Sequence, residues 1–298
     1  MVAAAHAFGV SHTAVSTHLI EATPDNLNDF KDRSLEDFTP FAVFLDTIHR
    51  GGEAVVVALG IDRAGQKRRL GFWQGATENH DICEELLADL ERRDCRLTAR
   101  VLFITDGGGG LRKALTARSG TKLLHQRCPI QKDRTIQRHL PTRWRKAAQR
   151  RVPSALEQPS DAEAKARLSE LERWLRPLNE SAADSLREAF AERLTVHRLK
   201  VPALLRKTLH STNPIASMFA TVRACERHIK RYRGSHKAQR WLAAVCLPCE
   251  KGVRRVKGFR EIAEVISTIE AEQAAVQKAE AAASSPQPGA TTEFQLRT

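Results

Sequence analysis

Apolar and polar residues follow two different patterns along this chain, which divide it into a strand-rich first part and a helix-rich second part. Three runs of strand length, 41–48, 53–62 and 67–75, are separated by the turn sequences HRGG and RAG. Short Gly-containing turns between such runs are typical of a meander. We therefore expect three antiparallel strands.

Helices and strands alternate after this meander. Thr77 and Glu78 begin a helical pattern that runs to about Arg93, with Ile82, Leu86, Leu87 and Leu90 on its apolar face. A fourth strand is expected over 99–108, a helix from Gly110, and a short fifth strand over 121–128. This order of elements is that of a ribonuclease-H-like fold, so the expected fold class is α/β with a mixed sheet.

The second part of the chain has few strand signals. Residues 130–210 are rich in Arg, Lys, Glu, Leu and Ala and predict several amphipathic helices. A long basic helix is expected over 211–232, and further helix over 236–277, broken near Pro248 and Gly258. The polar, Pro- and Gly-containing tail from Ala281 is expected to be disordered.

These patterns suggest five regions. At the N-terminus, Gly9 precedes a short helix capped by Ser11, which resembles the turn and second helix of a helix-turn-helix, although an ordinary surface helix fits as well. The expected regions are a helix-turn-helix remnant over 1–35, the first part of the core over 36–129, a helical insertion over 130–210, core-completing and basic helices over 211–277, and the tail over 278–298.

Charge narrows the class of partner. The 298 residues include 48 Lys and Arg against 35 Asp and Glu, a formal net charge of +13. Such self-repulsion adds nothing to folding, and its usual reason is an acidic partner, most commonly nucleic acid. Hydrophobic residues make up 42% of the chain but aromatics only 5%, so aliphatic side chains must fill the core.

The cysteines and the apolar runs argue against a secreted or membrane protein. Six cysteines are scattered without a disulfide framework, and the lone pair Cys246 and Cys249 is a weak zinc or redox signal. No apolar run approaches the roughly 18 residues needed to span a bilayer, and the N-terminus does not resemble a signal peptide. We expect a cytoplasmic protein.

Two acids stand within or directly after apolar runs of strand length. Asp46 lies inside the apolar run FLDTI, and Asp106 follows VLFIT just before Gly107–Gly110. Each alone fits a turn or helix cap, but in a ribonuclease-H-like sheet the first and fourth strands are neighbours. Their acids can then share a divalent ion, such as the Mg²⁺ that assists phosphodiester displacement. The Gly run lacks the GK[ST] ending of a nucleotide-binding loop.

Several segments, taken in order, resemble the Mutator-type transposases of bacterial insertion sequences: FLDTIHRGGEAVVVALGID, GFWQGATEN, LFITDGGGGLRKAL, HQRC, TVHRLKVPALLRKTLHSTNPI and RRVKGFR. The resemblance covers about residues 9 to 260. It implies a ribonuclease-H-like nuclease of the Asp-Asp-Glu kind, with an all-helical insertion before the final acid. It also implies two Mg²⁺ or Mn²⁺ ions, which serve to cut DNA at element ends and join them to a target. By this resemblance, Asp46 and Asp106 match the first two catalytic, metal-binding acids.

Three departures from the family pattern bear on activity. The third acid of the family lies in a Thr-Asn-x-Ile-Glu pattern, which here reads Thr212 to Ala216, and alanine has no oxygen for a metal. Glu226 lies roughly 15 Å further along the helix and is a poor substitute. Gln131 stands where the family tends to have His, and the chain retains only the Gly9–Thr17 end of the family's N-terminal region.

Clusters of Arg and Lys are candidates for phosphate contacts. Solvated helix faces are the alternative for each. The expected DNA-binding residues are Arg223, Arg227, Lys230, Arg231, Arg233, Arg254, Arg255 and Lys257, and a further cluster comprises Arg143, Arg145, Lys146, Arg150 and Arg151. The four tryptophans, Trp73, Trp144, Trp174 and Trp241, are expected to serve in packing rather than in base stacking.

Other side chains are expected to support the acids. By resemblance Glu78 and Cys128 belong to this group, although a first-turn helix charge would also explain Glu78. His49 follows the first acid closely, and His125 and His197 are alternatives that are more often structural.

The sequence therefore predicts an insertion-sequence transposase that is inactive or impaired, with DNA as its partner and a homodimeric assembly in the bacterial nucleoid. The alternative is a catalytically dead DNA-binding remnant or regulator that associates with an intact transposase. A decayed reading frame without a selected role is a third possibility.

Overall fold

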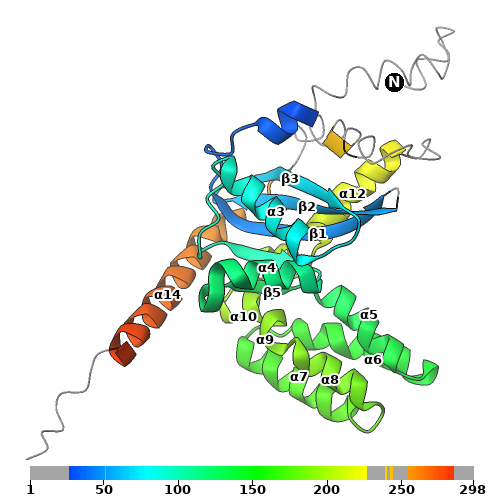
Figure 1. The fold of residues 1–298 in the computed structure, drawn as a ribbon. Coiled ribbons are helices and arrows are strands. Elements are labelled where there is room, and N and C mark those ends of the chain that lie inside the picture. Colours follow the sequence, from blue (N-terminus) through cyan, green and yellow to red (C-terminus); the bar gives the residue numbers. More distant parts are fainter. Residues whose placement is uncertain (1–26, 51, 227–238, 240–241, 244–253, 285–298) are drawn as a thin grey trace, which may run out of the picture.

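The computed structural model describes residues 27–50, 52–226, 239, 242–243 and 254–284. Within them, five strands form one mixed sheet in the order β3-β2-β1-β4-β5, and helices cover both of its faces (Figure 1). The strands are β1 Pro40–Arg50, β2 Glu53–Asp62, β3 Lys67–Gly75, β4 Leu102–Thr105 and β5 Leu124–Arg127. The sheet is central, and the candidate acids Asp46 and Asp106 lie within β1 and directly after β4, two neighbouring strands of its interior.

The predicted meander is confirmed. β1 pairs antiparallel with β2, and β2 pairs antiparallel with β3. β2 and β3 have the expected bounds, whereas β1 extends beyond the expected 41–48 at both ends. β2 is apolar on nearly every position because both faces of the sheet are covered.

The two remaining strands run parallel to β1. β4 pairs with β1 and β5 pairs with β4, both parallel. The connections to them are helical, with α3 His80–Arg92 before β4, and α4 Gly109–Ser119 and a 3₁₀ turn Gly120–Lys122 before β5. The order of elements expected from the sequence is therefore observed. β4 and β5 are shorter than the runs 99–108 and 121–128.

One face of the sheet packs on α3 and α4. Its core combines inward residues of the strands, such as Val43, Leu45 and Phe103, with Leu86 and Leu90 of α3. Arg93, at the end of α3, is 3% exposed; it donates to Leu70 O at 2.7 Å and pairs with Asp89 at 2.9 Å. These bonds satisfy a charge that burial would otherwise make costly.

The opposite face packs on helices from the second half of the chain. These are α10 Thr195–Arg198, α11 Ala203–Leu209, α12 Asn213–Glu226 and α14 Ile262–Ser284, which follows a 3₁₀ turn Phe259–Glu261. Their apolar side chains join Phe44, Leu102 and Ile104 of the strands in one core. α14 projects away from the sheet (Figure 1).

The predicted helical insertion forms a lobe of its own below the sheet in Figure 1. It contains α5 Pro129–His139, α6 Thr142–Leu156, α7 Asp161–Leu175, α8 Glu180–Glu188 and α9 Phe190–Arg193. These helices enclose a separate apolar core that includes Ile136, Leu168 and Leu186. Trp144 and Trp174 meet edge to face with ring centroids 6.0 Å apart, which agrees with the packing role predicted for them.

Some expected boundaries differ from the structure. The Asn79 side chain accepts from Ile82 N at 3.0 Å, so α3 begins at His80 rather than at Thr77 or Glu78. Residues 27–32 are helical and pack on the core, where Phe30 stacks on Phe72 at 5.4 Å. α14 continues to Ser284, past the expected boundary at 277.

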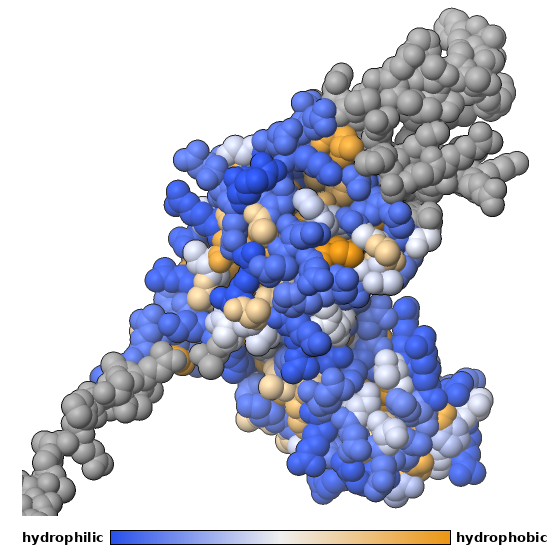
Figure 2. Space-filling view, in the orientation of Figure 1, coloured by the Kyte–Doolittle hydropathy of each residue, from blue (hydrophilic) through white to orange (hydrophobic). Residues whose placement is uncertain are grey.

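Other expectations lie outside the described residues: the N-terminal helix after Gly9, the pair Cys246 and Cys249, Trp241 and the end of the tail. Across the described part of the chain, no helix has both the length and the apolarity that crossing a membrane requires. The face seen in Figure 2 is mostly hydrophilic.

Candidate active site

Asp46 and Asp106 come together because β1 and β4 are parallel neighbours. Leu45 pairs with Thr105, so the next residue of each chain segment is one of the two acids. Side chains alternate across a sheet. Phe44 and Ile104 both point into the core on the α12 face, and the two acids, two residues further on, face the same way. The two carboxyl groups therefore lie on the same face of neighbouring strands, as a shared cation site requires.

The start of α12 closes this site from one side. Thr212 precedes the helix, is 6% exposed and donates to Cys128 Sγ at 3.5 Å. The hydrogen bond from Thr212 also lowers the pKa of Asp46 against the larger effects that raise it. Ala216 N donates to Thr212 O at 3.0 Å, so residue 216 lies one turn along the same side of the helix. Ala216, where the family resemblance led us to expect an acid, therefore lies one turn from Thr212, which contacts Asp46.

The surroundings of Asp46 disfavour the ionised form of its carboxyl group. Burial and the neighbouring Asp106 raise the pKa of Asp46 from 3.8 to about 7, with a smaller contribution from Glu78. Thr47 N opposes this by donating to Asp46 Oδ1 at 2.9 Å. A carboxyl group with such a raised pKa favours the presence of a cation or a proton nearby.

Glu78 is the third acid of this group. It lies between β3 and α3, and burial and Asp106 raise its pKa. Its Oε1 is buried without a hydrogen-bond partner, and it lies so close to Gly108 that a Cβ there would collide with it. Because Glu78 precedes the cap of α3, the alternative role as a first-turn helix charge is wrong.

His49 also reaches this group, since its charge acts on Glu78 and lowers its pKa. Cys128 is buried and makes the contact with Thr212. Within the described residues, no group of three or more His, Cys, Asp or Glu side chains is close enough to hold an ion together. The pair Asp46 and Asp106 is thus the central feature, with Glu78 and His49 beside it.

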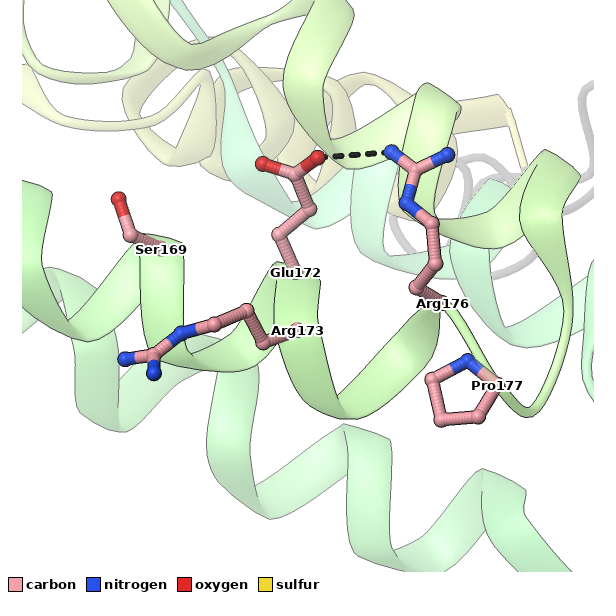
Figure 3. A pocket seen from close by; sticks show the side chains of 5 residues that line it. All are labelled: Ser169, Glu172, Arg173, Arg176 and Pro177. Atoms are coloured by element: carbon pink, nitrogen blue, oxygen red, sulfur yellow. Dashed lines mark hydrogen bonds and ion pairs between the residues drawn. The ribbon is translucent and has the colours of Figure 1, made fainter.

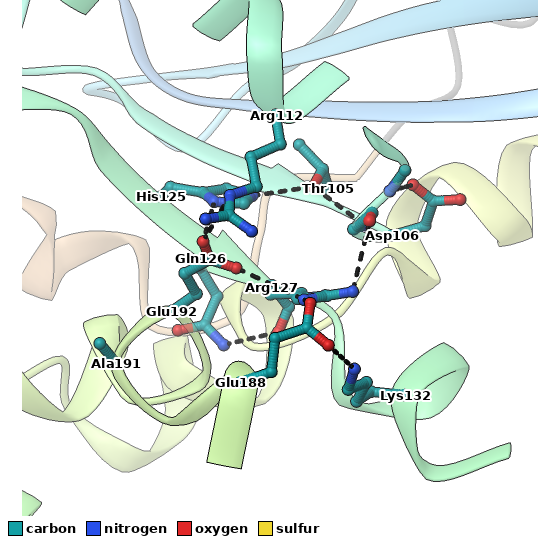
Figure 4. Close-up of polar contacts among 12 residues, drawn as sticks. Thr105, Asp106, Arg112, His125, Gln126, Arg127, Lys132, Glu188, Ala191 and Glu192 are labelled. Carbon is teal, nitrogen blue, oxygen red and sulfur yellow. Dashed lines mark hydrogen bonds and ion pairs between the residues drawn. The ribbon is translucent and has the colours of Figure 1, made fainter. Parts of the chain in front are cut away.

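The turn after β4 is fixed from the other side by Arg127 (Figure 4). Gly107 has φ +93°, and a Cβ there would collide with the Arg127 side chain, so only glycine fits. Arg127 donates to Gly107 O at 3.4 Å, and Gly108 N donates to Asp106 Oδ1 at 2.9 Å. Thr105 Oγ1 accepts from Gly107 N at 3.1 Å. These contacts determine where the Asp106 carboxylate lies.

Figure 4 shows that the same contacts extend to the insertion. Arg127 pairs with Glu188 of α8 at 3.2 Å, and Lys132 of α5 pairs with Glu188 at 2.6 Å. Arg112 of α4 pairs at 3.1 Å with Glu192 of α9. Gln126 donates to Arg193 O and accepts from Val196 N, both at 3.0 Å. The insertion is therefore attached directly behind the acidic turn.

The two alternative histidines have structural surroundings. His125 is 5% exposed, its Nε2 lies 2.8 Å from Thr105 Oγ1, and burial lowers its pKa to about 4. His197 Nε2 lies 2.9 Å from Leu156 O in the insertion. Neither of the acids Asp46 and Asp106 makes a hydrogen bond with these rings among the contacts of the described residues.

Arg254, Arg255 and Lys257 lie at the other end of the sheet. Val256 N donates to Gly65 O at 3.0 Å, in the turn after Asp62, which pairs with the first residue of β1. Asp46 lies six residues along β1, or about 20 Å away at the rise of a strand. Arg255 stacks over Phe259 at 5.2 Å.

The remaining candidates for DNA binding cannot be placed in the same way. Arg227, Lys230, Arg231 and Arg233 lie outside the described residues, and of Arg223 only the helical backbone is described.

A surface hollow on α7 lies away from the acids. Ser169, Glu172, Arg173, Arg176 and Pro177 line it, and Glu172 pairs with Arg176 at 2.7 Å (Figure 3). Its charges are largely compensated, so we assign it no part in the site.

Sequence reasoning did not identify Thr212 or Arg127 as site residues. Thr212 stands in the same motif as Ala216, so the motif itself held a signal. Arg127 held none, because a cation after a short strand gives no indication of which turn it will contact.

The fold and the site define an α/β protein with two acids side by side on neighbouring parallel strands, Asp46 within β1 and Asp106 directly after β4, in a strongly basic chain. The sequence profile of the Mutator family of transposases matches residues 1–252, and the chain belongs to this family. It is also similar to a probable transposase for an insertion sequence element of Corynebacterium diphtheriae. The two are 24% identical over 295 residues, which cover 89% of this chain and 82% of that relative. The family resemblance drawn from the motifs is confirmed.

Proposed function

We propose that this chain is an insertion-sequence transposase whose sheet is a ribonuclease-H-like core and whose Asp46 and Asp106 bind a divalent cation beside a DNA phosphodiester. The observation that carries the proposal is the register of β1 and β4, which sets Asp46 inside β1 and Asp106 just after β4 side by side on one face of the sheet. The order of strands and helices, with a helical insertion before α12, supports the fold assignment.

The donor set fits Mg²⁺ or Mn²⁺. Both ions prefer carboxylate oxygens. The carboxyl groups of Asp46 and Asp106 are partly buried, and among the described residues no cation acts on the pKa of Asp46. The buried Oε1 of Glu78 has no hydrogen-bond partner, as expected for an atom in a site that accommodates a cation. When bound, the ion would activate the attacking oxygen and stabilise the leaving oxygen of the phosphodiester.

The protein's own residues would position these groups. Thr47 N and Thr212 orient the Asp46 carboxyl, and the Gly107–Gly108 turn, held by Arg127, orients Asp106. Glu78 would support the site from the third side. Among the described residues, none stands in the position of Ala216 to supply the oxygen that alanine lacks, so we propose that DNA cleavage and strand transfer are impaired in this chain.

Metal binding can be tested without any activity. We expect 10 mM Mn²⁺ to raise the melting temperature by about 2–4 °C if it binds the folded chain with a Kd near 1 mM. Asp46→Asn and Asp106→Asn should each abolish this shift, because each removes a ligand. Asp81→Asn, which removes an exposed acid from α3, should keep it. An equal shift in all four proteins would contradict the metal site.

Activity can be tested by restoring the acid. Ala216→Glu should raise Mg²⁺-dependent cleavage of duplexes that carry the element ends by several powers of ten, since a charged ligand returns to the reaction centre. Ala220→Glu is the matched control, because it places the same side chain on an exposed position one turn further along α12. No cleavage by Ala216→Glu would contradict an intact catalytic architecture.

A second function is favoured by Ala216 itself. A chain that keeps the fold but lacks the third acid would act as a DNA-binding regulator. It would associate with an intact transposase in place of a second active copy. The expected result is that the chain inhibits an active Ala216→Glu protein when the two are mixed, and that inhibition depends on their ratio. Inhibition that excess DNA relieves completely would indicate competition for DNA rather than association.

A further inference from the structure

The insertion carries a segment whose charge is entirely positive. From Arg134 to Leu156, over most of α5 and all of α6, the sequence has seven Arg and Lys residues and no Asp or Glu. By contrast, α7 and α8, which pack beside them, mix acids and bases. On this lobe the purely positive segment therefore belongs to α5 and α6, whereas α7 and α8 carry charges of both signs.

Helical geometry sorts the seven cations. The buried residues of α6 are Ala148, Val152 and Ala155. At 100° per residue, Arg143, Lys146 and Arg150 fall in one stripe on the opposite side of the helix, and all three are exposed. On α5 the exposed Arg134 and Arg138 lie one turn apart, opposite the buried Lys132 and Ile136.

The other two cations have structural contacts. Arg145 Nε donates to Leu140 O at 3.0 Å, and Arg151 stacks over Trp174 at 4.7 Å. Both lie at the edges of the buried face of α6. Arg143 also lies 5.8 Å from the centroid of the neighbouring Trp144 ring, but it stays exposed and belongs to the outward stripe.

None of the five outward cations forms an ion pair with an acid among the described residues. On α7 and α8 the pattern is reversed: Lys165 pairs with Asp161 at 2.6 Å, Arg167 with Glu170 at 3.0 Å and Arg187 with Glu172 at 3.5 Å. A cation already neutralised by a neighbouring acid gains less from a phosphate than an unpaired one. Among the described residues of the lobe, Arg173 of α7 is likewise exposed without an ion pair, and the five outward cations of α5 and α6 are all available in this sense.

The surface also leads away from the acids. α5 begins directly after Cys128, which touches Thr212 beside Asp46. At 1.5 Å per residue, Arg134 and Arg138 lie about 9 and 15 Å along α5 from Cys128, and α6 continues from there. A duplex with one phosphate charge per roughly 1.7 Å of its axis presents charge over this whole length.

We propose that the outward cations of α5 and α6 form a phosphate-contacting surface for duplex DNA, which holds DNA that runs out from the acidic site. The five residues are Arg134, Arg138, Arg143, Lys146 and Arg150. The inference rests on the proposed function in that DNA is the partner, but it assigns the contact to the insertion. The surface contacts the DNA backbone and does not select sequence.

The test is the salt dependence of binding to a fluorescent random-sequence duplex of about 40 base pairs, measured by anisotropy on the full chain. One variant removes three unpaired cations, Arg143→Gln, Lys146→Gln and Arg150→Gln. The matched control removes three paired cations, Lys165→Gln, Arg167→Gln and Arg187→Gln. Both variants lose the same net charge from exposed helix positions, and circular dichroism melting checks that both fold.

Each phosphate contact contributes about 0.9 to the slope of log K against log salt, so the first variant should lose up to about 2.7 in slope and about 10–100-fold in affinity at low salt. The control should lose less than one contact's worth. Equal losses in the two variants, with wild-type binding intact, would overturn the surface and leave the proposed function standing. A wild-type chain that does not bind the duplex would overturn both.

Discussion

Asp46 shows at the residue scale how a site can oppose stability. An acid in an apolar strand is costly to bury, and the structure relieves only part of this cost, with the Thr47 backbone and Thr212. Asp106 and Glu78 add negative charge instead of a counter-charge. Such an arrangement is expected where function, rather than folding, has placed the residues.

The consequence for stability follows from the sign of the shift. The folded pKa of Asp46, about 7, lies above its ordinary value of 3.8, so the folded state binds a proton that the unfolded state has released between these values. Stability should therefore fall as pH rises from about 4 to 7, by roughly 2–4 kcal/mol. Asp46→Asn removes this titration.

We expect Asp46→Asn to be more stable than the wild type at pH 8 and similar to it at pH 4.5, in the absence of divalent ions. Urea denaturation at the two pH values measures the difference. If the variant is equally destabilised at both, the charge at this position is not the cost that we infer.

At the scale of elements, the helix cap and the strand pairing determined boundaries that the hydrophobic periodicity did not predict. The sequence predicted β2 and β3 within their observed bounds: β2 is buried on both faces and reads as a continuous apolar segment, whereas β3 mixes polar and apolar residues between Gly-containing turns. The start of α3 was misplaced because Asn79, and not Thr77, caps it. Glu78 therefore precedes the helix, and its side chain lies beside Asp106.

The link between β5 and the insertion is a second such feature. Gln126 is 1% exposed and forms buried hydrogen bonds with Arg193 O and Val196 N. We expect Gln126→Leu to cost about 2–3 kcal/mol, because it leaves both groups buried and unpaired. Gln131→Leu, on the outer side of α5, is the matched control and should change stability by less than about 0.5 kcal/mol.

Urea denaturation of both variants measures this difference. Comparable effects of the two substitutions would show that Gln126 does not hold the insertion to the sheet. A large effect confined to Gln126→Leu supports the attachment of α9 and α10 behind the Asp106 turn.

On the scale of the whole molecule, the described residues form separate apolar cores. Two lie on the faces of the sheet, and the third lies within the insertion. The insertion core is closed by its own helices, so local opening there need not disrupt the sheet.

We expect Leu168→Ala, at a fully buried position of the insertion core, to cost about 2–4 kcal/mol locally. In native-state hydrogen exchange, amides of α6 to α8 should lose protection while those of β1 and β2 keep theirs. Leu86→Ala, in the core under α3, should show the converse. Loss of protection throughout the chain in both variants would indicate one cooperative unit.

The sequence by itself determined the elements, their order, the basic character and the family, because these depend on local periodicity and on motifs with fixed residues. It also pointed to Asp46 and Asp106 as candidates, since acids within or directly after apolar strands are conspicuous. Only the tertiary structure decided that both acids face α12, that Glu78 and Thr212 join them, that Arg127 fixes their turn, and which cations remain unpaired. Those facts depend on strand register and on contacts between residues far apart in the chain, which no local pattern encodes.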